Sequence, residues 1–127
     1  MTTLAVPPVS TQSFSASAGQ DGPSVRLRFS GSADMEVHAQ LAQFLEHLHA
    51  KLAEMGIKRV VADIRGLYFM NSSCLKLFVV WLGRAAKLTE DDRYRVVFVM
   101  DPKLQWQRRT LEAMQAFAPA AMEIQEV

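Results

Sequence analysis

The first thirty residues contain two stretches in which apolar and polar side chains alternate. Over residues 25–29, valine, leucine and phenylalanine alternate with two arginines, which is the pattern of a half-buried β-strand. A looser alternation over residues 11–18 predicts an edge strand, and the cluster of turn residues at 19–23 predicts a β-hairpin between the two. Residues 1–10 hold a proline pair and small polar residues, so we expect an irregular lead-in there.

The rest of the chain alternates between helical and extended patterns. Apolar residues recur at helical spacing in three segments, and the first segment stops at Gly56, where a left-handed C-cap belongs. Two β-branched runs between these segments are typical of interior strands. In order, the predicted elements are a helix at 35–55, a strand at 57–64, a helix at 71–88, a strand at 94–100, a helix at 104–117 and a short strand at 122–127.

This order of elements predicts the fold class. Strands that alternate with helices favour right-handed crossovers and parallel pairing, and the hairpin adds an antiparallel edge. We therefore predict an α/β fold in which residues 11–127 form one domain. It is built on a mixed, mainly parallel sheet with an N-terminal β-hairpin and helices mainly on one side. The inward phase of each element predicts a shared core of Leu45, Leu48, Leu52, Val61, Phe78, Leu82 and Phe98.

Composition excludes several classes of protein. The chain has 127 residues, enough for one domain with a single core. Lys and Arg number 14 and Asp and Glu 13, a near-neutral balance that predicts no nucleic-acid partner. Cys74 is the single cysteine, which excludes an internal disulfide and fits a reducing compartment. We see no secretory signal in residues 1–22 and no apolar run of bilayer length, so we expect a cytoplasmic protein without a membrane span.

The sequence lacks the common signatures of enzymes. It has no phosphate-binding P-loop, and no G-x-S-x-G elbow surrounds Ser72. The three histidines, His38, His47 and His49, show no ligand spacing, and we read them as solvated residues on a helix face. We expect no catalytic residue, no cofactor and no metal. Cys74 lies in the first turn of a predicted helix, where it is either an activated thiol or, as we favour, a small apolar core residue.

The segment Asn71-Ser72-Ser73 is the strongest candidate for a functional site. All three residues are good helix N-caps, and a short predicted loop over residues 65–70 connects them to the predicted buried strand. A helix N-terminus presents outward N–H groups and a favourable field for an anion, so a phosphate attached there would be stabilised.

The helix behind this segment is apolar on nearly every side. A helix of this kind is either buried on two sides or leaves one face for a partner. In the first case Trp81 lies at the margin of a wide core stripe. In the second case Met70, Leu77, Val80 and Trp81 form a docking surface for another protein.

Residues 63–73 also resemble a known motif. Their order is Asp, apolar, any residue, Gly, apolar, any residue, aromatic, apolar, Asx, Ser, Ser, and it resembles the centre of STAS domains, the fold of anti-sigma-factor antagonists. The turn at 31–34 and the strand at 60–63 are similar to the family pattern too. The resemblance implies a non-enzymatic module of a partner-switching pathway.

The resemblance also implies a site and partners. It assigns phosphorylation to Ser72, flanked by Asn71, Ser73 and Cys74. A serine kinase that often doubles as an anti-sigma factor would add the phosphoryl group, and a metal-dependent serine phosphatase would remove it. Asn71 and Cys74 stand where the family usually has Asp and Gly.

Two alternatives remain open at this point. Residues 68–76 are similar to the SiaC-like branch, whose members regulate a cyclic-di-GMP synthase. A permanently bound, unphosphorylated STAS subunit of a transport or sensory complex would carry the same motif, with Ser72 and Ser73 acting only as helix caps.

Overall fold

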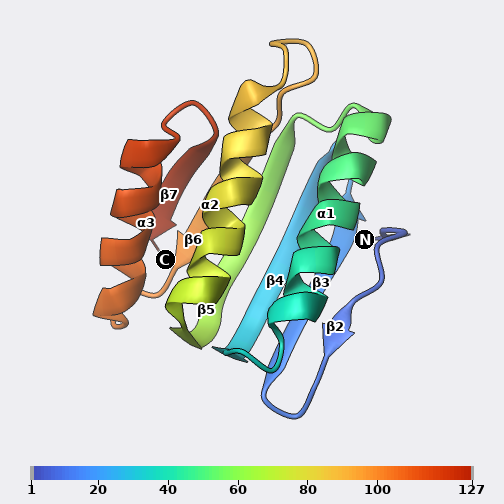
Figure 1. The fold of residues 1–127 in the computed structure, drawn as a ribbon. Coiled ribbons are helices and arrows are strands. Elements are labelled where there is room, and N and C mark those ends of the chain that lie inside the picture. Colours follow the sequence, from blue (N-terminus) through green and yellow to red (C-terminus); the bar gives the residue numbers. More distant parts are fainter. Residues whose placement is uncertain (1, 127) are drawn as a thin grey trace.

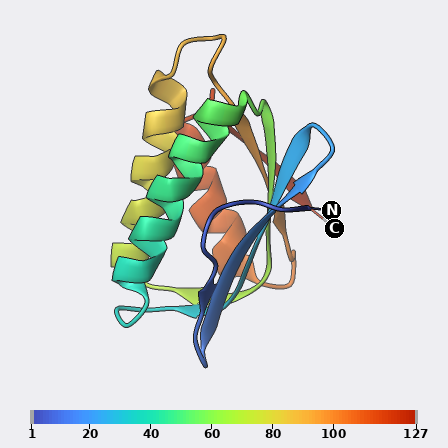
Figure 2. The same ribbon diagram turned by 90° about the vertical axis from the view of Figure 1, so that its right-hand side faces the viewer.

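The protein is a single sheet with helices packed on one of its faces (Figures 1 and 2). The computed structural model describes residues 2–126; Met1 and Val127, the outer ends of the predicted lead-in and last strand, lie outside the described residues. The strands are β1 (Thr2–Thr3), β2 (Val9–Ser10), β3 (Phe14–Asp21), β4 (Ser24–Ala33), β5 (Arg59–Met70), β6 (Arg95–Met100) and β7 (Met122–Glu126). The helices are α1 (His38–Met55), α2 (Ser72–Lys87) and α3 (Gln105–Phe117).

The sheet is antiparallel at its N-terminal edge and parallel beyond it. Its strand order is β1-β3-β4-β5-β6-β7, and β2 also pairs with β3. The β3–β4 hairpin is antiparallel, whereas β4, β5, β6 and β7 pair in parallel. The helices lie on the same side of this sheet (Figure 2). The predicted α/β fold with its hairpin, its mixed sheet and its one-sided helices is confirmed.

The N-terminal residues contradict the expected irregular lead-in. Thr2–Thr3 and Val9–Ser10 both pair antiparallel with β3, and Leu4, Val6 and Val9 are buried. The physical reason is that β3 is otherwise an edge strand with unpaired backbone groups, and these short segments cover it. The domain therefore begins before residue 11.

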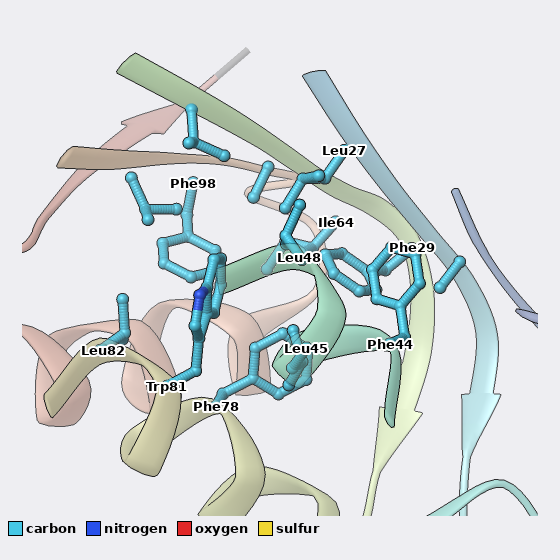
Figure 3. Packing of buried hydrophobic residues seen from close by; sticks show 14 of the residues in the cluster. Leu27, Phe29, Phe44, Leu45, Leu48, Ile64, Phe78, Trp81, Leu82 and Phe98 are labelled. Atoms are coloured by element: carbon cyan, nitrogen blue, oxygen red, sulfur yellow. The ribbon is translucent and has the colours of Figure 1, made fainter. Parts of the chain in front are cut away.

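The core lies between the sheet and the helices, as Figure 3 shows. Six of the seven predicted core residues are buried there: Leu45, Leu48, Leu52, Phe78, Leu82 and Phe98. Phe29 of β4 meets Phe44 and Phe78 edge-on, with ring centroids 5.9 and 5.2 Å apart, and so joins both α1 and α2 to the sheet.

Val61 was predicted with the wrong phase. Its neighbours Val60 and Ala62 are fully buried, whereas Val61 is only half-buried and pairs in register with the exposed Arg26. Side chains alternate along a strand, so Val61 points to the face that the helices leave uncovered. A continuous apolar run does not reveal which of its positions face the helices.

Helix α1 starts three residues later than expected. The side chain of Asp34 accepts a hydrogen bond from the N–H of Glu36 at 3.0 Å, which holds residues 34–37 in a turn before the helix begins at His38. Its end is as predicted, because Gly56 caps it with φ 67°.

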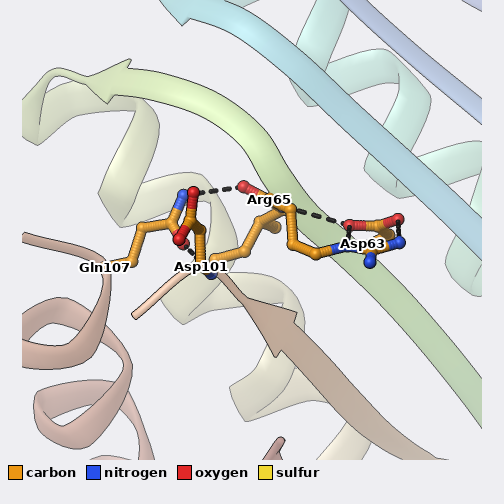
Figure 4. A network of polar contacts seen from close by, with 5 residues as sticks. Asp63, Arg65, Asp101 and Gln107 are labelled. Carbon is orange, nitrogen blue, oxygen red and sulfur yellow. Dashed lines mark hydrogen bonds and ion pairs between the residues drawn. The ribbon is translucent and has the colours of Figure 1, made fainter. Parts of the chain in front are cut away.

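On the side of β6, the second half of β5 is bonded by a side chain, whereas on its other side β4 pairs with it as far as Met70. β6 pairs with β5 only as far as Asp63. Beyond that point, Gln107 of α3 donates to the carbonyls of Ile64 and Leu67 at 2.7 and 2.9 Å. The carbonyl of Gln107 accepts from the N–H of Asp101 at 2.9 Å (Figure 4). Gln107 is fully buried, and both polar atoms of its amide group have hydrogen-bond partners, as buried polar atoms require.

We predict that Gln107→Leu destabilises the protein more than its small change in volume suggests. The substitution leaves two buried carbonyls and one N–H without a partner, at a cost of about 3 kcal/mol in the free energy of unfolding. Urea denaturation followed by circular dichroism measures it. Gln105→Leu, at an exposed position of the same helix, is the matched control, and equal midpoints for the two variants would contradict this role of Gln107.

Candidate functional site

Ser72 lies where the longest strand of the sheet meets a helix. β5 runs as far as Met70, one residue forms the connection, and α2 begins at Ser72 (Figure 1). The expected loop over residues 65–70 is therefore strand, because β4 continues to pair with it as far as Met70. The N–H of Asn71 donates to the carbonyl of Ala33 at 2.9 Å, which ties the connection to the end of β4.

Asn71 alone caps α2. Its backbone is extended, and its side-chain oxygen accepts from the N–H of Cys74 at 2.8 Å. Ser72 and Ser73 are the first helical residues and not caps, contrary to the expectation that all three residues cap. Within residues 2–126, neither serine hydroxyl takes part in a side-chain hydrogen bond. The Ser72 side chain is exposed, so it is free for chemistry that leaves the fold intact.

Cys74 is a structural residue. Its side chain is fully buried, and its thiol donates a weak hydrogen bond to the carbonyl of Asp34 at 3.4 Å. Burial, with a smaller effect of the nearby Asp34, raises the pKa of the Cys74 thiol above its ordinary value. The thiol is therefore protonated at neutral pH, which supports the apolar reading over the activated one.

The charge around Ser72 favours an anion. No acidic residue lies in the first turn of α2, and the positive end of the helix dipole points at Ser72. Lys76 follows one turn later with an exposed side chain. A phosphate on Ser72 would thus meet the N–H groups of a turn that contains no carboxylate of its own, although the charge of Asp34 reaches Cys74 in the same turn.

Apolar side chains are exposed at the same end of the sheet. Tyr68 and Phe69, at the end of β5, are 68% and 51% exposed, and Met35, in the turn after β4, is 63% exposed. These residues were not among those predicted for the site. The available signal was the apolar run at residues 67–70 outside the predicted strand and helix, since contiguous apolar residues outside the core often mark an interaction surface. Met70, which was assigned, is half-buried.

The predicted docking face of α2 is present only in part. Val80 is 59% exposed and Leu77 is half-buried, and both line a shallow groove of about 100 Å³ between α1 and α2. Trp81 contradicts the prediction, because only 2% of it is exposed. It forms the inner wall of the groove and belongs to the core.

A buried hydroxyl explains the position of Trp81. The indole N–H donates to the hydroxyl of Tyr94 at 2.7 Å, and that hydroxyl lies 2.7 Å from Nδ1 of His49. The indole can only donate, so the tyrosine proton is left for His49. His49 is buried and not solvated as expected. Burial, followed by the charge of Arg84, lowers the pKa of its imidazole. His47 is exposed and His38 is half-buried.

Comparison with known proteins identifies the fold. No protein-family model and no curated protein matches the sequence. Among solved structures, the crystal structure of an anti-sigma factor antagonist from Mycobacterium paratuberculosis matches with a TM-score of 0.65, over 92% of this chain and 90% of that chain. The two sequences are 17% identical, so the likeness shows a common fold. The protein is an α/β domain of the STAS-like fold.

The helices can also be compared, in length and apolar content, with the thickness of a bilayer. Among the helices in the described part of the chain, none has both the length and the apolar content that a bilayer crossing requires.

We predict that Asn71 and Ser72 respond differently to substitution by alanine. Asn71→Ala removes the hydrogen bond to the N–H of Cys74 and should lower the free energy of unfolding by about 1 kcal/mol. Ser72→Ala removes an exposed hydroxyl and should change it by about 0.5 kcal/mol or less. Chemical denaturation of both variants checks this, and the opposite ranking would show that Ser72 is the cap.

Proposed function

We propose that this protein is a non-enzymatic regulatory module that switches between protein partners according to the phosphorylation of Ser72. The observation that carries the proposal is the exposed hydroxyl of Ser72, which has no side-chain hydrogen bond within residues 2–126 and lies at a helix N-terminus whose first turn holds no acidic residue. The fold shared with an anti-sigma factor antagonist supports a role in regulation.

The proposed switch works through charge at an interface. A phosphoryl group adds about −1.5 to −2 charges and three acceptor oxygens at the start of α2. The helix dipole and the free N–H groups of the first turn stabilise it, so the domain stays folded. A partner packed closely on Ser72 would have to bury that charge, at a cost of several kcal/mol or more when the charge is unpaired.

The unphosphorylated surface is suited to a protein partner. Tyr68 and Phe69 are exposed at the end of β5 just before Ser72, Met35 is exposed in the turn after β4, and Val80 with Leu77 adds apolar area farther along α2. Exposed aromatic and methionine side chains are enriched at protein interfaces. We expect the partner to cover Ser72 and these residues together, with Trp81 supporting the surface from below.

The fold suggests the kinds of partner. By analogy with anti-sigma factor antagonists, the kinase would be a serine kinase that is also the switched partner, and a metal-dependent serine phosphatase would reverse the modification. This pathway would operate in the cytoplasm. These assignments rest on the shared fold and on the sequence motif, and the module itself would carry out no reaction.

Two alternatives within the same fold lead to different results. In the SiaC-like alternative, Ser72 is still phosphorylated, but the switched partner is a cyclic-di-GMP synthase. In the permanent-subunit alternative, the protein stays bound to a transport or sensory complex and Ser72 is never modified. Intact mass of the protein from its native cells separates the permanent subunit from the other two, and the identity of the co-purified partner separates those two from each other.

We predict that Ser72 variants bind the partner in a graded way. Ser72→Ala should fold normally, resist phosphorylation and retain the partner constitutively. Ser72→Asp should also fold, because an acidic residue is favourable in the first helical turn, but it should recover less partner because its carboxylate is desolvated in the interface. Pull-down from lysate of the native cells, with quantitative mass spectrometry, measures the recovery.

Ser73→Ala is the matched control for this experiment. It removes a neighbouring hydroxyl that is half-buried, and it should leave both phosphorylation and partner recovery close to the wild type. Equal recovery by the wild type, Ser72→Ala and Ser72→Asp would overturn the charge switch and favour the permanent subunit.

A further inference from the structure

A second concave surface lies on the face of the sheet that the helices leave open. It is a cavity of about 490 Å³, bounded by β3, β4 and β5 and, on one side, by Val6 and Pro8 of the N-terminal segment. In Figure 2 the β3–β4 turn bends away from the helices, toward this open face. Its volume lies within the range of about 300–1,000 Å³ that is usual for small-molecule sites.

Three arginines line this cavity, which we call the arginine groove. They are Arg26 and Arg28 of β4 and Arg65 of β5. Arg26 and Arg28 alternate with Val25, Leu27 and Phe29, which are fully buried under the helices, so the two guanidinium groups share the opposite face. Asp63 pairs in register with Arg28, which puts it on that face too.

The groove carries more positive charge than its own residues neutralise. Asp63 is engaged by Arg65, with Nε 3.0 Å from Oδ1 and Nη2 2.8 Å from Oδ2. That hydrogen bonding is the main reason why the pKa of Asp63 lies below its ordinary value, so the carboxylate is ionised at neutral pH. Among residues 2–126, Arg26 and Arg28 form no ion pair with a carboxylate. Three cations and one anion give the lining residues a net charge of +2. The charge of Arg28 also acts on Asp63, and Asp101 outside the groove acts on Arg65, so Arg26 is the least compensated of the three.

Within the described part of the chain, Arg65 alone makes hydrogen bonds to Asp63, so two of the three arginines are not held by a carboxylate in this way. Arg26 and Arg28 stand two residues apart on one face of a strand, where their like charges repel. This face also buries Val97 and Val99, which pair in register with Val61 and Asp63, but packing of that kind needs only the apolar stems of arginines and not their charged ends. The arrangement is the one that an anionic ligand requires, since planar guanidinium groups bind phosphate oxygens in pairs.

We propose that the arginine groove binds a small phosphate monoester. The dianionic phosphate would lie between Arg26 and Arg28 and balance the net charge of +2, whereas a carboxylate or sulfate ester would balance only half of it. Ser17, which pairs in register with Arg28, offers a hydroxyl beside the phosphate. The volume exceeds the need of phosphate alone, and Val6 and Pro8 provide an apolar wall for the organic group.

This site is separate from Ser72. Asp63 lies nine residues before Ser72, and the intervening chain is strand for most of its length, so the two places are roughly 25 Å apart. The proposal therefore stands or falls independently of the phosphorylation switch.

Phenyl phosphate is a suitable probe, and its binding to the full chain can be mapped by amide chemical shifts in nitrogen-15 NMR. We expect saturable shifts of the amides at residues 17–19 and 26–28, with no comparable shifts at residues 71–75. Phenyl sulfate and benzoate, both monoanions, should bind at least about tenfold more weakly, as should phenol. Shifts confined to residues 71–75, no saturable shift at millimolar probe, or equal binding of benzoate would overturn the proposal.

Substitution tests the arginines directly. Arg28→Gln and Arg26→Gln should each raise the dissociation constant for phenyl phosphate by about tenfold, because each removes a guanidinium from the phosphate. Arg109→Gln on α3 makes the same change of charge at an exposed position on the helical side, and it should leave the constant unchanged. Equal effects of Arg28→Gln and Arg109→Gln would show a mere response to net charge and refute the site. Unchanged amide spectra outside the groove establish that each variant is folded.

Discussion

The structure depends on the hydrogen bonds that β5 makes beyond the point where its neighbour β6 ends. This strand is twelve residues long, but β6 pairs only with its first five, so its outer half would have unpaired carbonyls within the core layer. Gln107 of α3 satisfies the carbonyls of Ile64 and Leu67 and at the same time holds the N–H of Asp101. One amide group thereby joins α3 to the end of β6 and to the part of β5 that β6 does not reach, while β4 pairs with β5 as far as Met70. A shorter β5 would place Asn71 and Ser72 elsewhere.

The position of Ser72 follows from this length and from one cap. β5 delivers the chain to Asn71, which bonds to Ala33 through its N–H and to the N–H of Cys74 through its side chain. Asn71 and Cys74 together fix the start of α2, so Ser72 has no structural duty although it sits between anchored residues. Because its neighbours fix the helix start, Ser72 can change its charge while its backbone stays in place. A switch that acts at a protein interface requires this property.

Features of the structure that follow from local sequence pattern were predicted correctly, whereas features that depend on contacts between distant residues were not. Period and β-branched content located the interior strands, and the Asn-Ser-Ser run located the start of α2. Trp81 and His49 were misplaced because their burial depends on the hydroxyl of Tyr94, more than ten residues away from either, which neither helical pattern reveals. The burial of Val61 was predicted wrongly because a continuous apolar run does not show which of its residues face the helices. Of the candidate site, the serine and its cap were predictable. Tyr68 and Phe69 were missed because they lie in the part of β5 beyond residue 64, where pairing with β4 extends the strand and no helix covers their side chains.

The two faces of the sheet explain why one small domain has room for two distinct sites. The helical face buries Leu27 and Phe29, and the proposed phosphorylation site lies at its end, where β5 meets α2. The opposite face has no helix, so the alternate residues Arg26 and Arg28 are free to carry charge without disturbing the core. Alternation along β4 thus keeps a basic surface and the apolar core one residue apart in sequence but on opposite sides of the sheet. A ligand held on the open face would leave the packing beneath α2 unchanged, and a phosphate on Ser72 would likewise not reach the arginines. The fold therefore permits the two sites to be occupied independently, with β5 as the element they share.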